Sequence, residues 1–229
     1  HTSKKFDAEL EGIRTRVLQM GGMVELQIVK AMEGLGGGDL LLIDQVIEND
    51  NRVNLLEIEL DEACNQVIAK RQPTAVDLRM VSTVQKTITD LERIGDEAKK
   101  IAKTAKQLHS ASSSFMPQIR LSPIADAGVD MLRTALDAYA RLDTIAAAQV
   151  VRHDKEVDAE FKGIMRQLIT YMIEDPRTIS QAIELMFVAK SVERIGDHAK
   201  NIAEYVVYMV KGRDVRHTSL EEIEREATR

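Results

Sequence analysis

Two pairs of carboxylates stand at matching places in the two halves of this 229-residue chain. Glu92 and Asp96 form the first pair, and Glu193 and Asp197 form the second. Because residues four apart lie on one face of a helix, each pair predicts two neighbouring negative charges. Their repulsion costs about 0.2–0.5 kcal/mol on a helix surface. A bound cation, a basic side chain or water would offset it.

Both pairs belong to a repeated segment. Residues 91–103 read LERIGDEAKKIAK and residues 192–204 read VERIGDHAKNIAE, with nine of thirteen positions identical. A repeat of this period indicates a structural unit that occurs twice. Each copy places a glycine, Gly95 or Gly196, inside the expected helix, where glycine costs roughly 1 kcal/mol relative to alanine. Close approach of a ligand or crowding by a facing helix would explain these glycines.

A second acid-rich segment in each half offers further oxygen ligands. Asp50 and Asn54, and likewise Asp154 and Asp158, have the same spacing of four residues. Each half therefore predicts a site where side chains from two helices surround one point. Such oxygen donors suit divalent or trivalent metal ions, here Mg²⁺, Mn²⁺, Fe or Zn²⁺. In the alternative interpretation the acids are solvated or pair with nearby basic residues, namely Arg93, Arg194, Lys99 and Lys200.

No catalytic residue is predicted. The sequence lacks a Glu-x-x-His pattern, a metalloprotease pair, a glycine-rich phosphate loop and a credible nucleophile with its base. Histidines such as His198 are interpreted as surface or packing residues, and the single cysteine, Cys64, as a small core side chain. A carboxylate-ligated metal enzyme, either a hydrolase or a redox protein, is the alternative to a non-enzymatic role. A purely structural bundle is the third hypothesis.

Composition indicates packed helices and a protein of the cytoplasm. The chain is 44% hydrophobic but only 3% aromatic, and it has four prolines and no tryptophan. Its net charge of −6 argues against nucleic acid as a partner. No polybasic anchor is visible, and Tyr205–Val210 is among the longest apolar runs, too short to cross a bilayer.

The predicted fold is all-α, with two tandem, similar three-helix up-and-down bundles made from six long helices. Residues 1–109 form the first bundle, 110–123 the linker, 124–212 the second bundle, and 213–229 a charged tail that is either a short helix or frayed. Asp39, Thr74 and Thr178 are expected to cap helices. The expected helices are Thr2–Leu35, Asp39–Lys70, Ala75–Leu108, Ile124–Leu142, Thr144–Ile173 and Thr178–Val210.

The duplicated LERIGD and VERIGDH segments resemble the signature of the PhoU family of bacterial phosphate-signalling regulators. Further stretches resemble its proteobacterial branch, so the resemblance covers nearly the whole chain: FDAELEGIRTRVLQMGGMVELQIVKA at residues 6–31, DEACNQVIAKRQPTAVDL at 61–78, RQLITYMIEDPRT at 166–178 and VKGRDVRH at 210–217.

This resemblance implies two similar three-helix bundles, a homodimer, and a negative regulator of the phosphate regulon. Such a protein links the phosphate ABC transporter, through its ATPase subunit, to a membrane sensor histidine kinase, and it reaches the inner membrane only through these partners. It also implies metal clusters held by Glu/Asp-x-x-x-Asp motifs. Glu92/Asp96, Glu193/Asp197 and Asp154/Asp158 match that motif. Asp50/Asn54 departs from it, because an amide brings no charge, so the first site is expected to be weaker or empty.

Overall fold

The computed structural model describes residues 4–111 and 115–229 and consists of helices and their connections. The expected start of the first helix at Thr2 and the serines at 112–114 of the linker lie outside the described residues. The helices are α1 (Lys4–Gly37), α2 (Leu40–Arg71), α3 (Ala75–Ser110), α4 (Ser122–Arg141), α5 (Thr144–Glu174), the short 3₁₀ helix η1 (Pro176–Thr178), α6 (Ile179–Lys211) and α7 (Leu220–Thr228).

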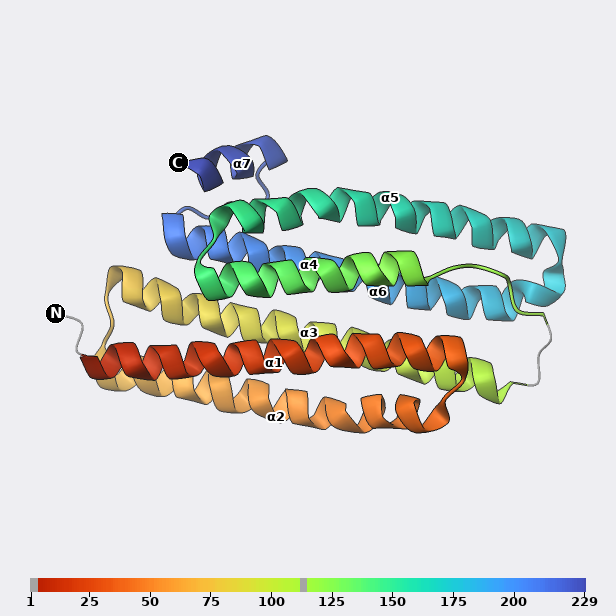
Figure 1. The fold of residues 1–229 in the computed structure, drawn as a ribbon, viewed down its shortest axis with the longest axis horizontal. Coiled ribbons are helices and arrows are strands. Elements are labelled where there is room, and N and C mark those ends of the chain that lie inside the picture. The colour runs from red at the N-terminus through yellow and green to blue at the C-terminus, as the bar shows by residue number, and fades with distance from the viewer. Residues whose placement is uncertain (1–3, 112–114) are drawn as a thin grey trace.

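The predicted all-α class with two three-helix bundles is confirmed. Figure 1 shows α1, α2 and α3 in the lower layer, α4, α5 and α6 above them, and both chain ends on the left. The tail is no frayed segment: it forms α7, where the Ser219 hydroxyl accepts a hydrogen bond from the Glu222 amide at 3.2 Å. Helix α4 begins at Ser122, two residues earlier than expected.

Of the three caps expected at Asp39, Thr74 and Thr178, the Asp39 side chain acts as predicted and accepts a hydrogen bond from the Leu42 amide at 3.1 Å. The capping boxes at Thr74 and Thr178 are wrong. The Asp77 amide donates to the backbone carbonyl of Thr74 instead. The Thr178 hydroxyl donates to the carbonyls of Tyr171 and Asp175, because η1 precedes α6 there.

The two bundles share one continuous hydrophobic core, and α3 and α6 form its centre. These helices run antiparallel and carry the two copies of the repeat, so the copies face each other across the contact (Figure 1). Polar groups join them as well. The Asp90 carboxylate accepts hydrogen bonds from His198 Nδ1 at 2.6 Å and from Asn201 at 3.1 Å, and Arg194 Nε lies 3.3 Å from Glu97. His198 is therefore a bridge between the bundles, a role that sequence reasoning missed.

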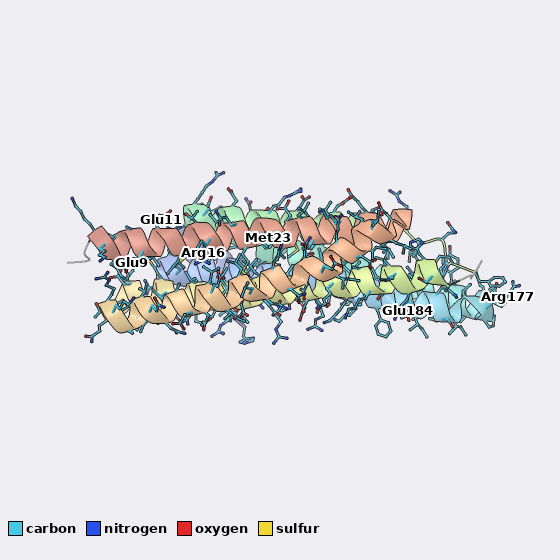
Figure 2. The ribbon with its side chains drawn as sticks, turned by 90° about the horizontal axis from the view of Figure 1, so that it is seen from below. Glu9, Glu11, Arg16, Met23, Arg177 and Glu184 are labelled. Atoms are coloured by element: carbon cyan, nitrogen blue, oxygen red, sulfur yellow. The ribbon has the colours of Figure 1, made fainter. Side chains whose placement is uncertain are left out.

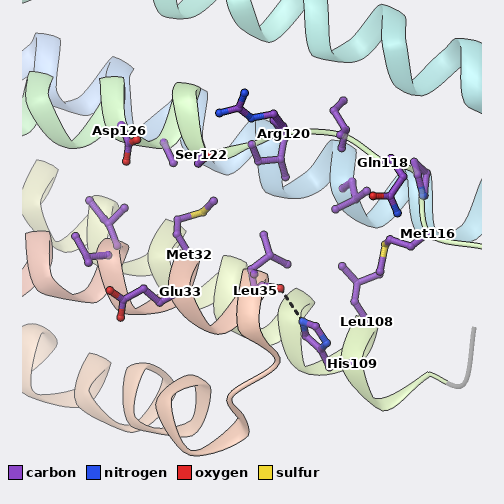
Figure 3. Close-up of a pocket in the computed structure, with 18 of the residues that line it drawn as sticks. Met32, Glu33, Leu35, Leu108, His109, Met116, Gln118, Arg120, Ser122 and Asp126 are labelled. Carbon is purple, nitrogen blue, oxygen red and sulfur yellow. Dashed lines mark hydrogen bonds between the residues drawn. The ribbon is translucent and has the colours of Figure 1, made fainter. Parts of the chain in front are cut away.

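A cleft of about 640 Å³ opens where the 116–121 segment passes the ends of α1 and α3 (Figure 3). Its walls include Met32, Leu108 and Met116, and His109 Nε2 donates to the Leu35 carbonyl at 2.7 Å beside it. Among the described residues, no helix combines the length and the apolar character that a membrane crossing requires.

Candidate metal centres

The second bundle brings three of its predicted ligands together. Asp154 and Asp158 project from α5 and Asp197 projects from α6, and each offers a carboxylate oxygen within 4.8 Å of the others. The i, i+4 spacing places the α5 pair on one face, and the packing of α5 on α6 adds the third carboxylate. Three converging carboxylates make a site suited to a hard cation.

Glu193 lies at the edge of this cluster. Its Oε2 is 2.7 Å from Lys190 Nζ, so an ammonium already neutralises part of its charge. Burial, followed by the charges of Glu193 and Asp154, raises the pKa of Asp197 to about 6. The charges of these neighbouring acids thus add to the effect of burial on Asp197, and a bound cation would relieve their repulsion.

A lysine holds one oxygen of the buried aspartate in this bundle. Lys200 Nζ lies 2.8 Å from Asp154 Oδ2. Asp154 is 4% exposed, and its other oxygen, Oδ1, is buried without a hydrogen-bond partner among the described residues. Burial raises the pKa of Asp154, and the hydrogen bond from Lys200 opposes that rise. An unpartnered buried oxygen costs about 1–3 kcal/mol, so Oδ1 is a ready ligand position.

The first bundle repeats this arrangement with a different ligand set. Lys99 Nζ lies 2.7 Å from Asp50 Oδ2, and Asp50 Oδ1 is again buried with no hydrogen-bond partner in the described part of the chain. The Asn54 side-chain amide donates a hydrogen bond to Asp50 Oδ2 at 3.4 Å, and no described residue donates to its own buried carbonyl oxygen. Gly95 allows close packing here, since a Cβ on it would lie 3.3 Å from Val53 Cγ1 and 3.7 Å from Asp50 Oδ1.

Glu92 and Asp96 interact with each other and with an acid that the sequence reasoning missed. Burial raises the pKa of Glu92, and the charges of Asp96 and then Glu57 add to the rise. Glu57 follows Asp50 by seven residues on α2, so helical spacing could have revealed it. Within the described residues, no three carboxylates of this bundle meet as closely as those of the second bundle.

Two features of the described residues would suit a metal ion. The second bundle gathers three carboxylates around one point. Each bundle also has a buried aspartate oxygen that accepts no hydrogen bond from the described residues, while a lysine lies against the other oxygen of the same carboxylate. The basic residues near the repeated motif differ in their contacts. Lys99 and Lys200 enter the sites, whereas Arg194 turns to Glu97 on α3.

Comparison with known proteins gives these sites a family context. The model of the PhoU domain matches residues 17–105 and again residues 121–206. The chain belongs to the PhoU family. The two matches fall on the two bundles, so the internal repeat is a repeat of the PhoU domain.

Related PhoU proteins cover almost all of the chain. The phosphate-specific transport system accessory protein PhoU of Serratia marcescens is 49% identical over 226 residues, which are 98% of this chain and 92% of that protein. The PhoU of Escherichia coli K12, with the same name, is 48% identical over 226 residues, covering 98% of this chain and 93% of its own length.

Solved PhoU structures share the fold. The crystal structure of PhoU from Pseudomonas aeruginosa has a TM-score of 0.87 and 45% sequence identity, and it covers 91% of this chain and 100% of its own. The phosphate transport system regulatory protein PhoU from Streptococcus pneumoniae has a TM-score of 0.82 and 25% identity, covering 92% of this chain and 99% of its own.

Proposed function

We propose that this chain is a regulatory accessory protein of the phosphate-specific transport system. It acts as a non-enzymatic adaptor between the transporter's ATPase subunit and a sensor histidine kinase, and it restrains phosphate uptake and signalling when phosphate is plentiful. The observation that carries the proposal is the 49% identity, over 98% of the chain, to a protein named as the accessory protein of that system.

The fold suits an adaptor. Long helices packed around one core present extended, rigid faces on which a helical or cytoplasmic partner domain docks by burying apolar side chains. The chain works in the cytoplasm as a homodimer, and partners bring it to the inner membrane.

Metal binding forms the second part of the proposal. Asp154, Asp158 and Asp197, with Glu193 beside them, hold a divalent or trivalent ion in the second bundle. The first bundle binds more weakly, because Asn54 replaces an acid. A bound cation would neutralise the carboxylates and cross-link α5 to α6.

Deletion of the gene in its host tests the regulatory role. Phosphate-starvation genes should become active in phosphate-rich medium, and expression of the chain from a plasmid should silence them again. Starvation genes that stay silent after deletion would reject the proposal.

Elemental analysis of protein purified without chelator tests the metal sites. Stoichiometric metal should be present in the wild type and lost when Glu193 and Asp197 are both changed to Ala. A trace of metal that is the same in both proteins would show that the acids are structural.

A further inference from the structure

A basic groove runs between α3 and α6 on the surface of this acidic chain. The hollow measures about 320 Å³, and its walls carry four cationic side chains and one carboxylate. The cations are Lys100, Lys103, Lys190 and Arg194. The whole chain has a net charge of −6, so a cluster of four positive side chains is opposite in sign to the net charge of the protein. Figure 2 shows α6 beside α3 along the lower edge of the view, with Glu184 labelled on α6 and Arg177 on η1.

Helix ends do not account for these cations. Basic residues stabilise a helix when they lie in its last turn, where they meet the negative end of the helix dipole. Lys100 and Lys103 lie about two turns or more before the end of α3 at Ser110. Lys190 and Arg194 stand in the middle of α6. Their clustering is therefore unexplained by the needs of either helix.

The groove's single carboxylate is already shared. Glu97 is 2% exposed and lies 2.9 Å from Lys100 Nζ and 3.3 Å from Arg194 Nε. Lys190 pairs with Glu193 at 2.7 Å. Lys103 is exposed and forms no ion pair within the described residues. The side chains of Lys100 and Lys190 are about half exposed, so much of the positive charge faces solvent. An occupant with carboxylates would find donors already in place.

An apolar stripe on α6 leads into the groove. Ile179, Ile183 and Phe187 follow one another at four-residue spacing and therefore share a helix face. They are 40%, 40% and 60% exposed, and Phe187 also lines the groove. Apolar anchors at one-turn intervals beside a row of cations complement a helix that carries apolar residues on one side and acids at its edge.

We propose that the groove between α3 and α6 docks an acidic amphipathic helix of a partner protein. Phe187 contacts the apolar face of that helix, and Lys100, Lys103 and Arg194 pair with its carboxylates. The inference rests on the proposed adaptor function, and it names the surface by which the adaptor holds one of its partners.

Binding of the full-length chain to two purified probes tests this surface. The probes are the cytoplasmic region of the host's sensor kinase and the host's transporter ATPase subunit, each immobilised and measured over a series of salt concentrations. Charge reversal in a Lys100→Glu/Lys103→Glu variant should weaken binding to one probe by about tenfold or more and flatten its salt dependence. Phe187→Ser should weaken the same interaction by about fivefold or more without changing the salt dependence.

Matched substitutions elsewhere provide the controls. Lys70 and Lys155 are exposed lysines outside the groove, and Leu41 is 78% exposed on α2. Lys70→Glu/Lys155→Glu and Leu41→Ser should bind as the wild type does. Because Lys103 is exposed and forms no ion pair within the described residues, Lys103→Glu alone should leave the fold intact and still lower the affinity.

The outcomes separate the groove from the adaptor role. If the wild type binds a probe and the groove variants bind it as well as the controls do, the groove is not the docking surface. The proposed function would then still stand. A wild-type chain that binds neither probe would overturn both. Inorganic phosphate, titrated alone, should give no heat that depends on Lys100 and Lys103. A heat of phosphate binding that disappears in the Lys100→Glu/Lys103→Glu variant would show that the groove binds a small anion, and it would overturn the proposal.

Discussion

At the scale of single residues, a lysine ammonium in each bundle pairs with a buried aspartate that is also a predicted metal ligand. Lys200 Nζ contacts Asp154, and its side chain is 33% exposed. Replacing Lys200 by Met would leave the Asp154 charge buried beside Asp158 and Asp197. We expect metal-free Lys200→Met to lose about 1–3 kcal/mol of unfolding free energy in urea, less than a fully buried pair costs. Added Mn²⁺ should raise its melting temperature more than that of the wild type.

The exposed Lys155 on the same helix supplies the comparison for this experiment. Lys155→Met should unfold at the urea concentration of the wild type. An equal loss in both variants would mean that Lys200 stabilises the helix by general charge effects and not through Asp154.

Glu204, also on α6, gives the molecule a pH-dependent stability. It is 6% exposed, and burial raises its pKa to about 7. The unfolded value is about 4.3, so the folded chain binds the extra proton between these two values. Stability from this group is complete below about pH 4 and is lost as the pH rises through 7. Glu204→Gln should therefore stabilise the protein by about 1–3 kcal/mol above pH 7 and change little at pH 4.

Thermal melts at several pH values check this prediction, with the exposed Glu156→Gln as the comparison. A gain that is the same at every pH would show that the glutamine packs better, and that Glu204 does not titrate in this range.

Residue spacing predicted which acids to examine but not what surrounds them. The i, i+4 pattern pointed to Asp154, Asp158 and Asp197, which the fold brings together. The sequence interpretation treated Lys200 as an alternative to a metal, whereas the structure places it on one aspartate oxygen and leaves the other free. His198 was missed because its partner, Asp90, lies on another helix, and periodicity within one helix carries no information about such contacts.

At the scale of elements, two adjacent glycines on α1, Gly21 and Gly22, allow the effect of helix propensity to be measured separately from that of packing against α4. A Cβ on Gly21 would lie 2.7 Å from the buried Leu136 side chain on α4, whereas one on Gly22 would meet nothing within 4 Å. Gly22→Ala should stabilise the protein by about 0.5–1 kcal/mol, and Gly21→Ala should destabilise it by about 1–2 kcal/mol. Urea unfolding of both variants measures this contrast, and equal gains would show that α1 and α4 separate easily.

Periodicity predicted the helices well and their ends less well. Apolar residues at helical spacing fixed α2, with Asp39 capping it as expected. The errors at Thr74 and Thr178 have a local cause, because a threonine cap needs its hydroxyl turned toward the helix amides. Thr178 instead turns its hydroxyl back to the carbonyls that end α5.

At the scale of the whole molecule, we expect the shared core to make the two bundles unfold together. Asp90→Ala removes the acceptor for His198 and Asn201 across the α3–α6 contact. We expect a loss of about 1–3 kcal/mol in a single transition, and a smaller loss for Asp90→Asn. Tyrosine fluorescence and circular dichroism should report the same midpoint. Two separated transitions would show that each bundle folds alone.

The arrangement of the bundles lay beyond sequence reasoning. The repeat predicted two similar units, but it carried no information about which faces meet. The structure places α3 against α6, which fuses the two expected cores into one. That choice depends on side chains far apart along the chain, such as Asp90 and His198.

Lys190 belongs to both the carboxylate cluster and the basic groove. Its ammonium lies 2.7 Å from Glu193, and Lys190 also lines the hollow between α3 and α6. An ion bound to Glu193 would compete with this ammonium for the carboxylate and so change the charge balance beside the groove. Thermodynamic linkage is reciprocal. If the ion raised the affinity for a docked helix by some factor, the docked helix would raise the affinity for the ion by the same factor. Because both sites contain Lys190, ion binding at the carboxylate cluster and helix docking in the groove would be coupled.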